Sequence, residues 1–327
     1  MVRRFGPPES LQVEEVASPV PGPGEVLVAV HACAVNFPDT LMIEDKYQVK
    51  PPLPFSPGGE VAGRVLAMGA GVEGFDIGER VIAVSRWGGF AEQVLADADR
   101  VVPLPDGVGM EAAASLFMTY GTSQYALRER AELQPGETLL VLGAAGGTGL
   151  SAVEIGRLLG ARVIAAASSD EKLSLCKSQG AHETINYATE DLRERVKTLT
   201  GGRGVDVVYD PVGGRHSEPA LRGMAWRGRY LVIGFATGEI PKPPLNLALL
   251  KGCSIVGVFY GAFVKAEPQR YRELRSELVG WLADGKIRPA ITARYPLERA
   301  AQALRVVADG RAMGKIVVTT AAGRAAG

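Results

Sequence analysis

The chain has 327 residues, and its 36 lysines and arginines balance its 36 aspartates and glutamates. This length suffices for two domains with a sizeable core each. The neutral balance disfavours nucleic acid or a membrane surface as partner, and no apolar run approaches the roughly 20 residues that span a bilayer. The first residues contain no apolar signal core, so we expect a cytoplasmic protein.

The first hundred residues are predicted to be rich in β-structure. Short β-branched runs at residues 25–34, 61–68 and 80–84 are separated by clusters of proline and glycine at 19–24 and 51–59. This spacing predicts a compact, antiparallel, barrel-like unit.

From about Glu111 the pattern changes to an alternation of strands and helices. The predicted strands are residues 138–142, 162–167, 183–186, 205–209, 229–233 and 254–258, and the predicted helices are 150–159, 171–179, 191–199 and 217–224. Such alternation predicts an α/β fold with a doubly wound parallel sheet.

The turn between the first of these strands and its helix is rich in glycine. Gly146 and Gly149 match the last two positions of a G-x-G-x-x-G pattern, and Ala144 stands at the first. The exposed N–H groups at the start of a helix favour an anion, and small residues allow a pyrophosphate to approach the backbone. We therefore expect Gly146, Gly147, Thr148 and Gly149 to contact a dinucleotide.

The C-terminal part departs from the alternation. Helices are predicted at 268–284 and 297–308, and an apolar strand at 315–320. A single strand at the end of a chain needs a sheet to join, so we expect it to return to the β-rich first unit.

Several segments, taken together, resemble one known family. They are residues 34–39 (AVNFPD), 54–63 (PFSPGGEVAG), 120–122 (YGT), 180–187 (GAHETINY), 207–214 (VVYDPVGG) and 314–317 (GKIV). The chain is thereby similar to the zinc-independent, zeta-crystallin-like NADPH quinone oxidoreductases of the medium-chain dehydrogenase/reductase superfamily. The resemblance implies a GroES-like catalytic domain over residues 1–118, a Rossmann dinucleotide-binding domain over 119–260, and a return to the catalytic domain over 261–327. Only four residues precede Phe5, so the first edge strand of such relatives is expected to be short or missing.

The residues argue against a catalytic metal. Where zinc-dependent relatives carry a zinc-binding cysteine and histidine, this chain has Asn36 and Gly59. An amide and a hydrogen atom cannot replace a thiolate and an imidazole. The cysteines (33, 176, 253) and histidines (31, 182, 216) are scattered, so we expect no metal, and hydrogen-bond donors must polarise the substrate.

The end of the second Rossmann strand favours NADPH over NADH. An acidic residue normally binds the ribose hydroxyls there, but this strand ends in Ser168-Ser169. In the family, the residues matching Lys172 and Tyr187 bind the 2′-phosphate; taken alone, Lys172 could equally be a solvated surface charge. Asp170 and Glu171 are expected to serve as cap and first-turn residues of a helix.

Further cofactor contacts follow from the resemblance and from the ends of successive strands. They are Thr122, Gly213, Gly214, Ile233, Gly234, Phe235, Ala236, Val258, Phe259 and Tyr260. Phe235 and Phe259 could equally be core aromatics, and Arg311 and Lys315 could reach the cofactor or lie on the surface.

At the reacting end, Asn36 and Tyr47 are the candidate catalytic residues. Asn36 can donate a hydrogen bond to a developing oxyanion, and Tyr47 can contact a ring substrate or, as in the family, the cofactor. Asp39 is expected to be a structural acceptor. No nucleophile with a neighbouring base is visible, which disfavours hydrolysis.

We therefore expect reduction of a quinone by NADPH. Reduction of an activated C=C bond, in an enoyl thioester or a 2-alkenal, is the alternative, and a low-turnover NADPH-binding protein is a third. The expected partners are a small-molecule substrate and, by family analogy, a second copy in a homodimer or homotetramer paired through residues 254–258.

Overall fold

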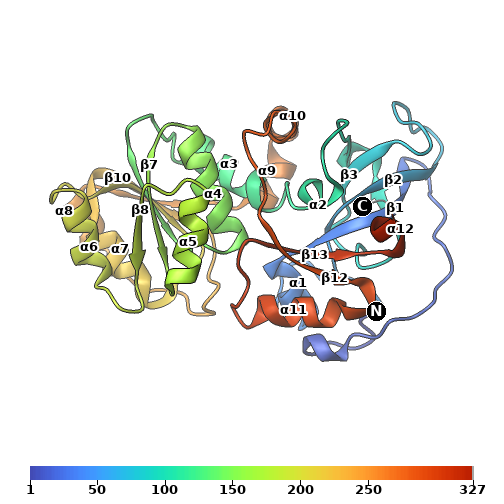
Figure 1. Cartoon of the computed structure of the whole chain (residues 1–327), viewed down its shortest axis with the longest axis horizontal. Helices are drawn as coiled ribbons and strands as arrows, with labels where there is room; N and C mark the ends of the chain where they lie inside the picture. Colours follow the sequence, from blue (N-terminus) through green and yellow to red (C-terminus); the bar gives the residue numbers. More distant parts are fainter. Residues whose placement is uncertain (326–327) are drawn as a thin grey trace. The chain divides into compact units, whose positions relative to one another are not determined.

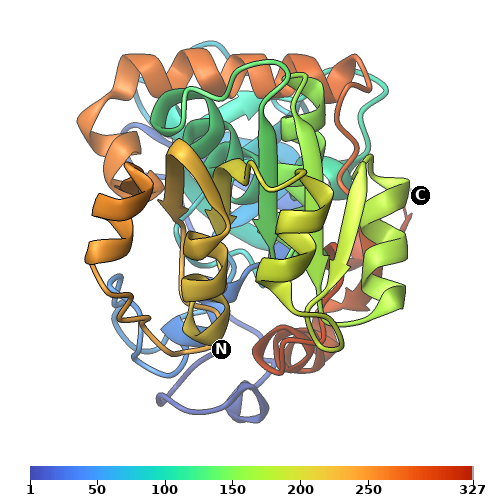
Figure 2. The ribbon, with the colours of Figure 1, turned by 90° about the vertical axis from the view of Figure 1, so that its left-hand side faces the viewer.

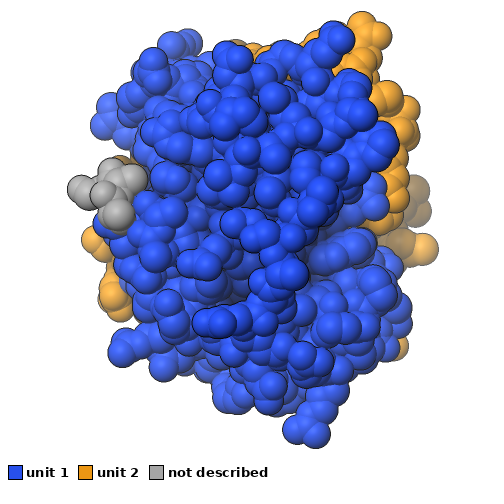
Figure 3. All heavy atoms as spheres, turned by 90° about the vertical axis from the view of Figure 1, so that its right-hand side faces the viewer, with its two compact units in different colours: residues 1–118, 279–327 blue, residues 119–278 orange. Residues whose placement is uncertain are grey.

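A computed structural model describes residues 1–325 and divides the chain into two compact units (Figure 1). Unit 1 comprises residues 1–118 and 279–327, and unit 2 comprises residues 119–278; Figure 3 colours them blue and orange. None of the helices in the described part of the chain is both long and apolar enough to cross a membrane.

Unit 1 is built on a seven-stranded sheet with the order β12-β13-β1-β2-β3-β5, and β4 pairs with β1. Its strands are β1 (Glu25–Val35), β2 (Glu60–Met68), β3 (Arg80–Val84), β4 (Gln93–Asp97), β5 (Val101–Pro103), β12 (Ile291–Pro296) and β13 (Lys315–Thr319). The C-terminal strand β13 pairs antiparallel with β1, with Cys33 opposite Val318. This pairing confirms the predicted return. At the start of the chain, a single bridge joins Val2 to Phe55.

Valine-rich strands and one amphipathic helix enclose the core of unit 1. Buried side chains of β1, β2 and β3 pack together with Ala303 and Leu304 of α11 (Ala300–Ala308). The other helices are α1 (Phe37–Met42), α2 (Met110–Ala113) and α12 (Ala321–Ala325). Asn36 and Asp39 form a capping box at the start of α1, which fixes the chain direction after β1.

Unit 2 contains a six-stranded, wholly parallel sheet with the order β11-β10-β9-β6-β7-β8. The strands are β6 (Thr138–Leu142), β7 (Arg162–Ala167), β8 (Glu183–Asn186), β9 (Val205–Asp210), β10 (Met224–Val232) and β11 (Ser254–Gly257). The direction of winding reverses between β6 and β9, as in the Rossmann fold, and a ligand binds at the carboxyl edge beside such a reversal.

Helices cover both faces of this sheet. Figure 1 shows α6 (Leu192–Leu199), α7 (Ser217–Arg222) and α8 (Asn246–Lys251) on one side, and α3 (Thr119–Gln124), α4 (Gly147–Leu158) and α5 (Asp170–Ser178) on the other. Figure 2 views unit 2 with α6 and α7 in front of the strands. The near-continuous apolar character of β6 and β7 follows from burial on both faces.

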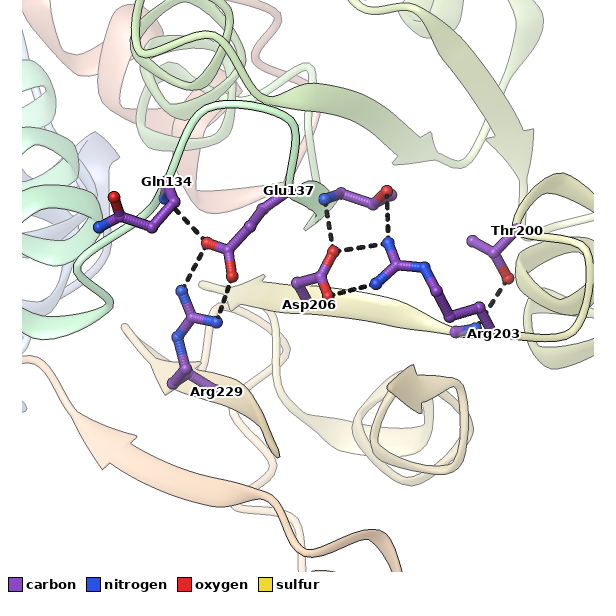
Figure 4. A network of polar contacts seen from close by, with 8 residues as sticks. Gln134, Glu137, Thr200, Arg203, Asp206 and Arg229 are labelled. Atoms are coloured by element: carbon purple, nitrogen blue, oxygen red, sulfur yellow. Dashed lines mark hydrogen bonds and ion pairs between the residues drawn. The ribbon is translucent and has the colours of Figure 1, made fainter. Parts of the chain in front are cut away.

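Ion pairs join the strands at the amino edge of the sheet, opposite the expected ligand edge (Figure 4). Arg229 of β10 makes two hydrogen bonds of 2.7 Å to Glu137, which precedes β6. Asp206 of β9 accepts from the Thr138 backbone N–H at 2.7 Å and from Arg203 at 2.6 and 2.8 Å. These contacts hold β6, β9 and β10 in register away from the ligand edge.

The second domain boundary differs from the prediction. Residues 261–278 belong to unit 2, although the sequence analysis assigns them to the returning segment. The reason is an aromatic cluster: Phe263 of α9 (Tyr260–Ala266) stacks on Tyr125 at 4.1 Å, and Tyr271 and Leu274 of α10 (Pro268–Ala283) pack beside it. Several elements that are short or lack clear periodicity were not predicted from the sequence: α1, α2, α3, α8, α9, β4, β5 and β12.

Candidate active site

The carboxyl edge of the unit 2 sheet collects most of the predicted cofactor residues. Because the six strands are parallel, the turns that follow them lie at one edge. These turns contain Gly146–Gly149 after β6, Ser168 after β7, Tyr187 after β8, Gly213 and Gly214 after β9, Ile233–Ala236 after β10, and Val258–Tyr260 after β11.

The glycine turn after β6 has the shape that a close anion requires. A Cβ on Gly149 would lie 2.3 Å from the Gly143 carbonyl oxygen, so only glycine permits this tight turn. At Gly146, by contrast, a Cβ would meet only that same oxygen at 3.4 Å, so this glycine leaves the backbone open rather than filling a packed space. Within residues 1–325, no side chain caps α4 at Gly146. The N–H groups of its first turn fit an anionic group such as a pyrophosphate.

Ser168, Lys172 and Tyr187 come together beyond the end of β7. The Lys172 Nζ donates to the Ser168 Oγ at 3.2 Å, and the Tyr187 N–H donates to the carbonyl of Ala167 at 3.1 Å. Ser169 caps α5 by accepting from the Lys172 N–H, while Asp170 accepts from the Asn186 side chain at 2.8 Å. Asp170 is therefore held by an amide. It and Glu171 are first-turn residues of α5, and the expected cap role of an acidic residue is wrong, because Ser169 is the cap.

Two residues at this corner were missed by the sequence analysis. The His216 ring lies 4.2 Å from the Tyr187 ring, and the Arg215 Nε donates to His216 Nε2 across 3.5 Å. Burial raises the pKa of Tyr187, and the nearby Arg215 charge opposes that effect. The Gly-Gly-Arg-His run gives no local signal of this contact, because Tyr187 follows a different strand.

A buried carboxylate holds the loop after β9. Asp210 Oδ1 accepts from the N–H groups of Val212 and Gly213 at 2.8 and 2.9 Å, and Oδ2 accepts from Ser217 and Tyr230. Gly213 and Gly214 adopt positive φ angles of 72° and 60°, which favour glycine. This clamp fixes the loop that carries Arg215 and His216.

The remaining predicted contacts lie on α3 and after β10 and β11. Thr122 lies on α3 beside Gly121, where a Cβ would be 2.2 Å from the Tyr260 hydroxyl. Tyr260 also packs against the aromatic cluster of unit 2. Phe259 is 66% exposed, which excludes the core alternative considered for it, whereas Phe235 is half-buried beside Gly213.

Within unit 1, Asn36 lies in a buried polar cluster. Asp39 accepts from the Asn36 N–H at 2.8 Å and from the Gly58 N–H at 3.1 Å, which confirms its structural acceptor role. The Lys315 Nζ donates to Asn36 Oδ1 at 2.6 Å. Lys315 is only 4% exposed, so the surface alternative for it is wrong; Arg311 is exposed and pairs with Asp309 at 2.9 Å.

Glu60 is a further site residue that was not predicted from the sequence. It is fully buried, and its Oε1 accepts from the N–H groups of Phe117 and Met118. Burial raises the pKa of Glu60 to about 7 and that of Asp39 to about 6, although the Lys315 charge opposes both shifts. Tyr47 is half-buried, and burial and the Asp39 charge raise its pKa. The cluster can hold an exchangeable proton near neutral pH.

The donors around Asn36 do not fit a catalytic zinc. Among the residues that the structure describes, no group of three or more His, Cys, Asp or Glu side chains could hold a metal ion. Burial raises the pKa of the Cys33 thiol well above its usual value, and Lys315 brings a positive charge to the cluster. His182 accepts from the Val163 N–H in unit 2, far along the chain. The prediction that the protein binds no metal still awaits a direct test.

Comparisons with known proteins agree with this architecture. Residues 22–106 match the alcohol dehydrogenase GroES-like domain family, and residues 147–279 match the zinc-binding dehydrogenase family. The chain is 40% identical over 312 residues to quinone oxidoreductase-like protein 2 of Rattus norvegicus, covering 95% of this chain and 89% of the relative.

Two solved structures are similar over 97 to 98% of each chain. One is a quinone oxidoreductase of Escherichia coli complexed with NADPH, with a TM-score of 0.90 and 31% identity. The other is the CurK enoyl reductase, with a TM-score of 0.87 and 27% identity. The GroES-like and Rossmann folds predicted from the sequence are confirmed. The chain belongs to the quinone oxidoreductase family of the medium-chain dehydrogenase/reductase superfamily.

Proposed function

We propose that this protein is an NADPH-dependent oxidoreductase that reduces a quinone without a catalytic metal. The observation that carries the proposal is the group of Ser168, Lys172 and Tyr187 at the end of β7, where no acidic residue occupies the strand end. A hydroxyl, an ammonium and a phenol suit a 2′-phosphate, whereas NAD-preferring folds place a carboxylate there. The similarity to an NADPH complex of a quinone oxidoreductase supports the same cofactor.

The residues of unit 2 would bind and orient the cofactor. Gly146, Gly147, Thr148 and Gly149 would hold the pyrophosphate, with Gly214 and the loops after β10 and β11 as further contacts. When bound, NADPH supplies the hydride. The Asp210 clamp and the tight turn at Gly149 keep these loops in place before the cofactor arrives, which reduces the ordering cost of binding.

Asn36 would donate a hydrogen bond to the substrate oxygen that gains charge. Its Oδ1 accepts from Lys315, so Nδ2 is the donor group of the amide, and this group also serves the Glu60 carboxylate, with which a substrate oxygen would share it. Lys315 is therefore a positioning residue for Asn36. Tyr47 would contact the substrate or the cofactor, and Asp39 and Glu60 keep a proton available within the same cluster.

The similarity to an enoyl reductase favours a second candidate, reduction of an activated C=C bond. The hydride geometry is the same in both reactions, but the alkene needs a proton on carbon. The test follows NADPH oxidation with a benzoquinone, a 2-alkenal and an enoyl-CoA under one set of conditions. Turnover of the quinone supports the first proposal, turnover of the alkenal or thioester alone supports the second, and turnover of none favours an NADPH-binding protein.

We further propose that two copies pair through β11. This strand lies at the edge of the unit 2 sheet, and among residues 1–325 its one pairing partner is β10. Its Ile255 is 42% exposed, and Trp226, Leu249 and Leu250 are exposed too. An unpaired, apolar strand edge is a template for another strand, and twofold pairing of β11 with itself would cover it.

A further inference from the structure

The loop after β9 brings two basic residues to the corner of unit 2 that contains Tyr187. The His216 and Tyr187 rings lie 4.2 Å apart and are inclined by 36°. The Arg215 Nε donates to His216 Nε2 across 3.5 Å, so the guanidinium lies beside this pair of rings. We call Ser168, Lys172, Tyr187, Arg215 and His216 the ribose-phosphate corner.

One backbone and one side-chain hydrogen bond connect residues of this corner. The Tyr187 N–H donates to the Ala167 carbonyl at 3.1 Å, which puts Tyr187 next to Ser168, and the Lys172 Nζ donates to the Ser168 Oγ at 3.2 Å. On the other side, the Asp210 clamp holds the loop that carries Arg215. The corner therefore contains one cation from α5, Lys172, and one from the loop after β9, Arg215, whose charge acts on Tyr187.

Three carboxylates around the corner have other partners, whereas a fourth, Glu239, lies beside Gly214, where its Oε2 is 3.5 Å from the position that a Cβ would take. Asp170 accepts from the Asn186 side chain at 2.8 Å, and Glu190 pairs with Arg195 at 2.6 Å. Asp210 uses both oxygens for Val212, Gly213, Ser217 and Tyr230. Across residues 1–325, the Arg215 side chain makes its hydrogen bond to His216 and no ion pair. Its positive charge is left for a ligand.

We propose that Arg215 is a specificity-determining residue that binds the phosphomonoester of a phosphorylated ribose and so selects NADPH over NADH. The inference rests on the proposed function, because it takes the 2′-phosphate as the ligand. A guanidinium offers paired N–H donors that match two phosphate oxygens, which the ammonium of Lys172 cannot do. The His216 ring, packed on Tyr187, limits the positions that the guanidinium adopts.

The test is calorimetric binding of 2′,5′-ADP and 5′-ADP to the full chain, with no turnover required. Arg215→Gln should weaken 2′,5′-ADP about 10-fold or more and change 5′-ADP less than about twofold, since a charge-assisted pair is lost only with the former. Arg215→Lys should lose less. Arg193→Gln is the matched control: it removes the same charge from an exposed position on α6 of the same unit and should alter neither ligand.

The outcomes separate this inference from the proposed function. If Arg215→Gln leaves the ratio of the two affinities unchanged while Lys172→Gln lowers it, Arg215 plays no such role and the NADPH proposal stands. If Arg215→Gln weakens both ligands equally, the residue is structural and the inference is wrong. If the unaltered protein does not prefer 2′,5′-ADP, the NADPH preference and the role of Arg215 fall together.

Discussion

Replacing Lys315 by methionine tests the electrostatics of the buried cluster in unit 1. The substitution keeps an unbranched side chain of similar size but removes the ammonium that donates to Asn36 Oδ1 at 2.6 Å. The Lys315 charge lowers the pKa of both Asp39 and Glu60 against the larger effect of burial. Without it, we expect both carboxyl groups to keep their protons to a higher pH.

The expected effect on stability depends on pH. Because burial raises the pKa of Glu60 from 4.5 to about 7, the folded state binds this proton more tightly than the unfolded chain, and stability falls as pH rises through that window. At 1.36 kcal/mol per pH unit, the free energy of unfolding falls by about 3 kcal/mol between pH 4.5 and about pH 7. Asp39, raised from 3.8 to about 6, acts in the same direction at lower pH. When the carboxylates are ionised, removing the Lys315 ammonium should lower the free energy of unfolding by about 3–5 kcal/mol more.

The measurement is urea unfolding of the unaltered protein and of Lys315→Met at pH 5 and pH 8. Lys315→Met should destabilise the protein strongly at pH 8 and little at pH 5, where the two carboxyl groups are protonated and a buried ammonium is itself unfavourable. Lys286→Met, at a half-exposed lysine paired with Asp284, should have a small effect at both values. An equal loss for Lys315→Met at both pH values would refute the reasoning.

Four further predictions address the cofactor edge, the reacting end, the sheet and the assembly. Lys172→Glu should weaken NADPH binding far more than NADH binding, measured by fluorescence titration; equal losses would contradict the phosphate assignment. Asn36→Ala should lower kcat about 100-fold with the NADPH affinity nearly unchanged, and an unchanged kcat would remove Asn36 from the chemistry. Glu137→Gln should lower the free energy of unfolding by about 1–2 kcal/mol through the loss of its paired bonds to Arg229, with activity retained; no change in the urea midpoint would show the pair to be dispensable. Ile255→Lys should shift the sedimenting species from dimer to monomer, and a monomeric unaltered protein would rule out pairing through β11.

Local sequence determined the units of the Rossmann sheet. The strands at residues 138–142, 162–167 and 183–186 have the predicted bounds, because buried parallel strands are short, apolar and bordered by turn residues. The glycine turn was also predictable, because the close approach that requires glycine at 149 is to Gly143, only six residues earlier in the chain. The family followed from motifs spread along the whole chain.

Only the tertiary structure decided which distant residues meet. Lys315 donates a hydrogen bond to Asn36 across 279 positions of sequence, and Glu60 lies in the same buried cluster. In the sequence these three look like ordinary polar and charged residues. Arg215 and His216 reach Tyr187 because Asp210 holds the loop after β9. An aromatic cluster places α9 and the first part of α10, up to residue 278, in unit 2. Periodicity and turn chemistry act between near neighbours, whereas burial and long-range electrostatics depend on how the finished sheets pack.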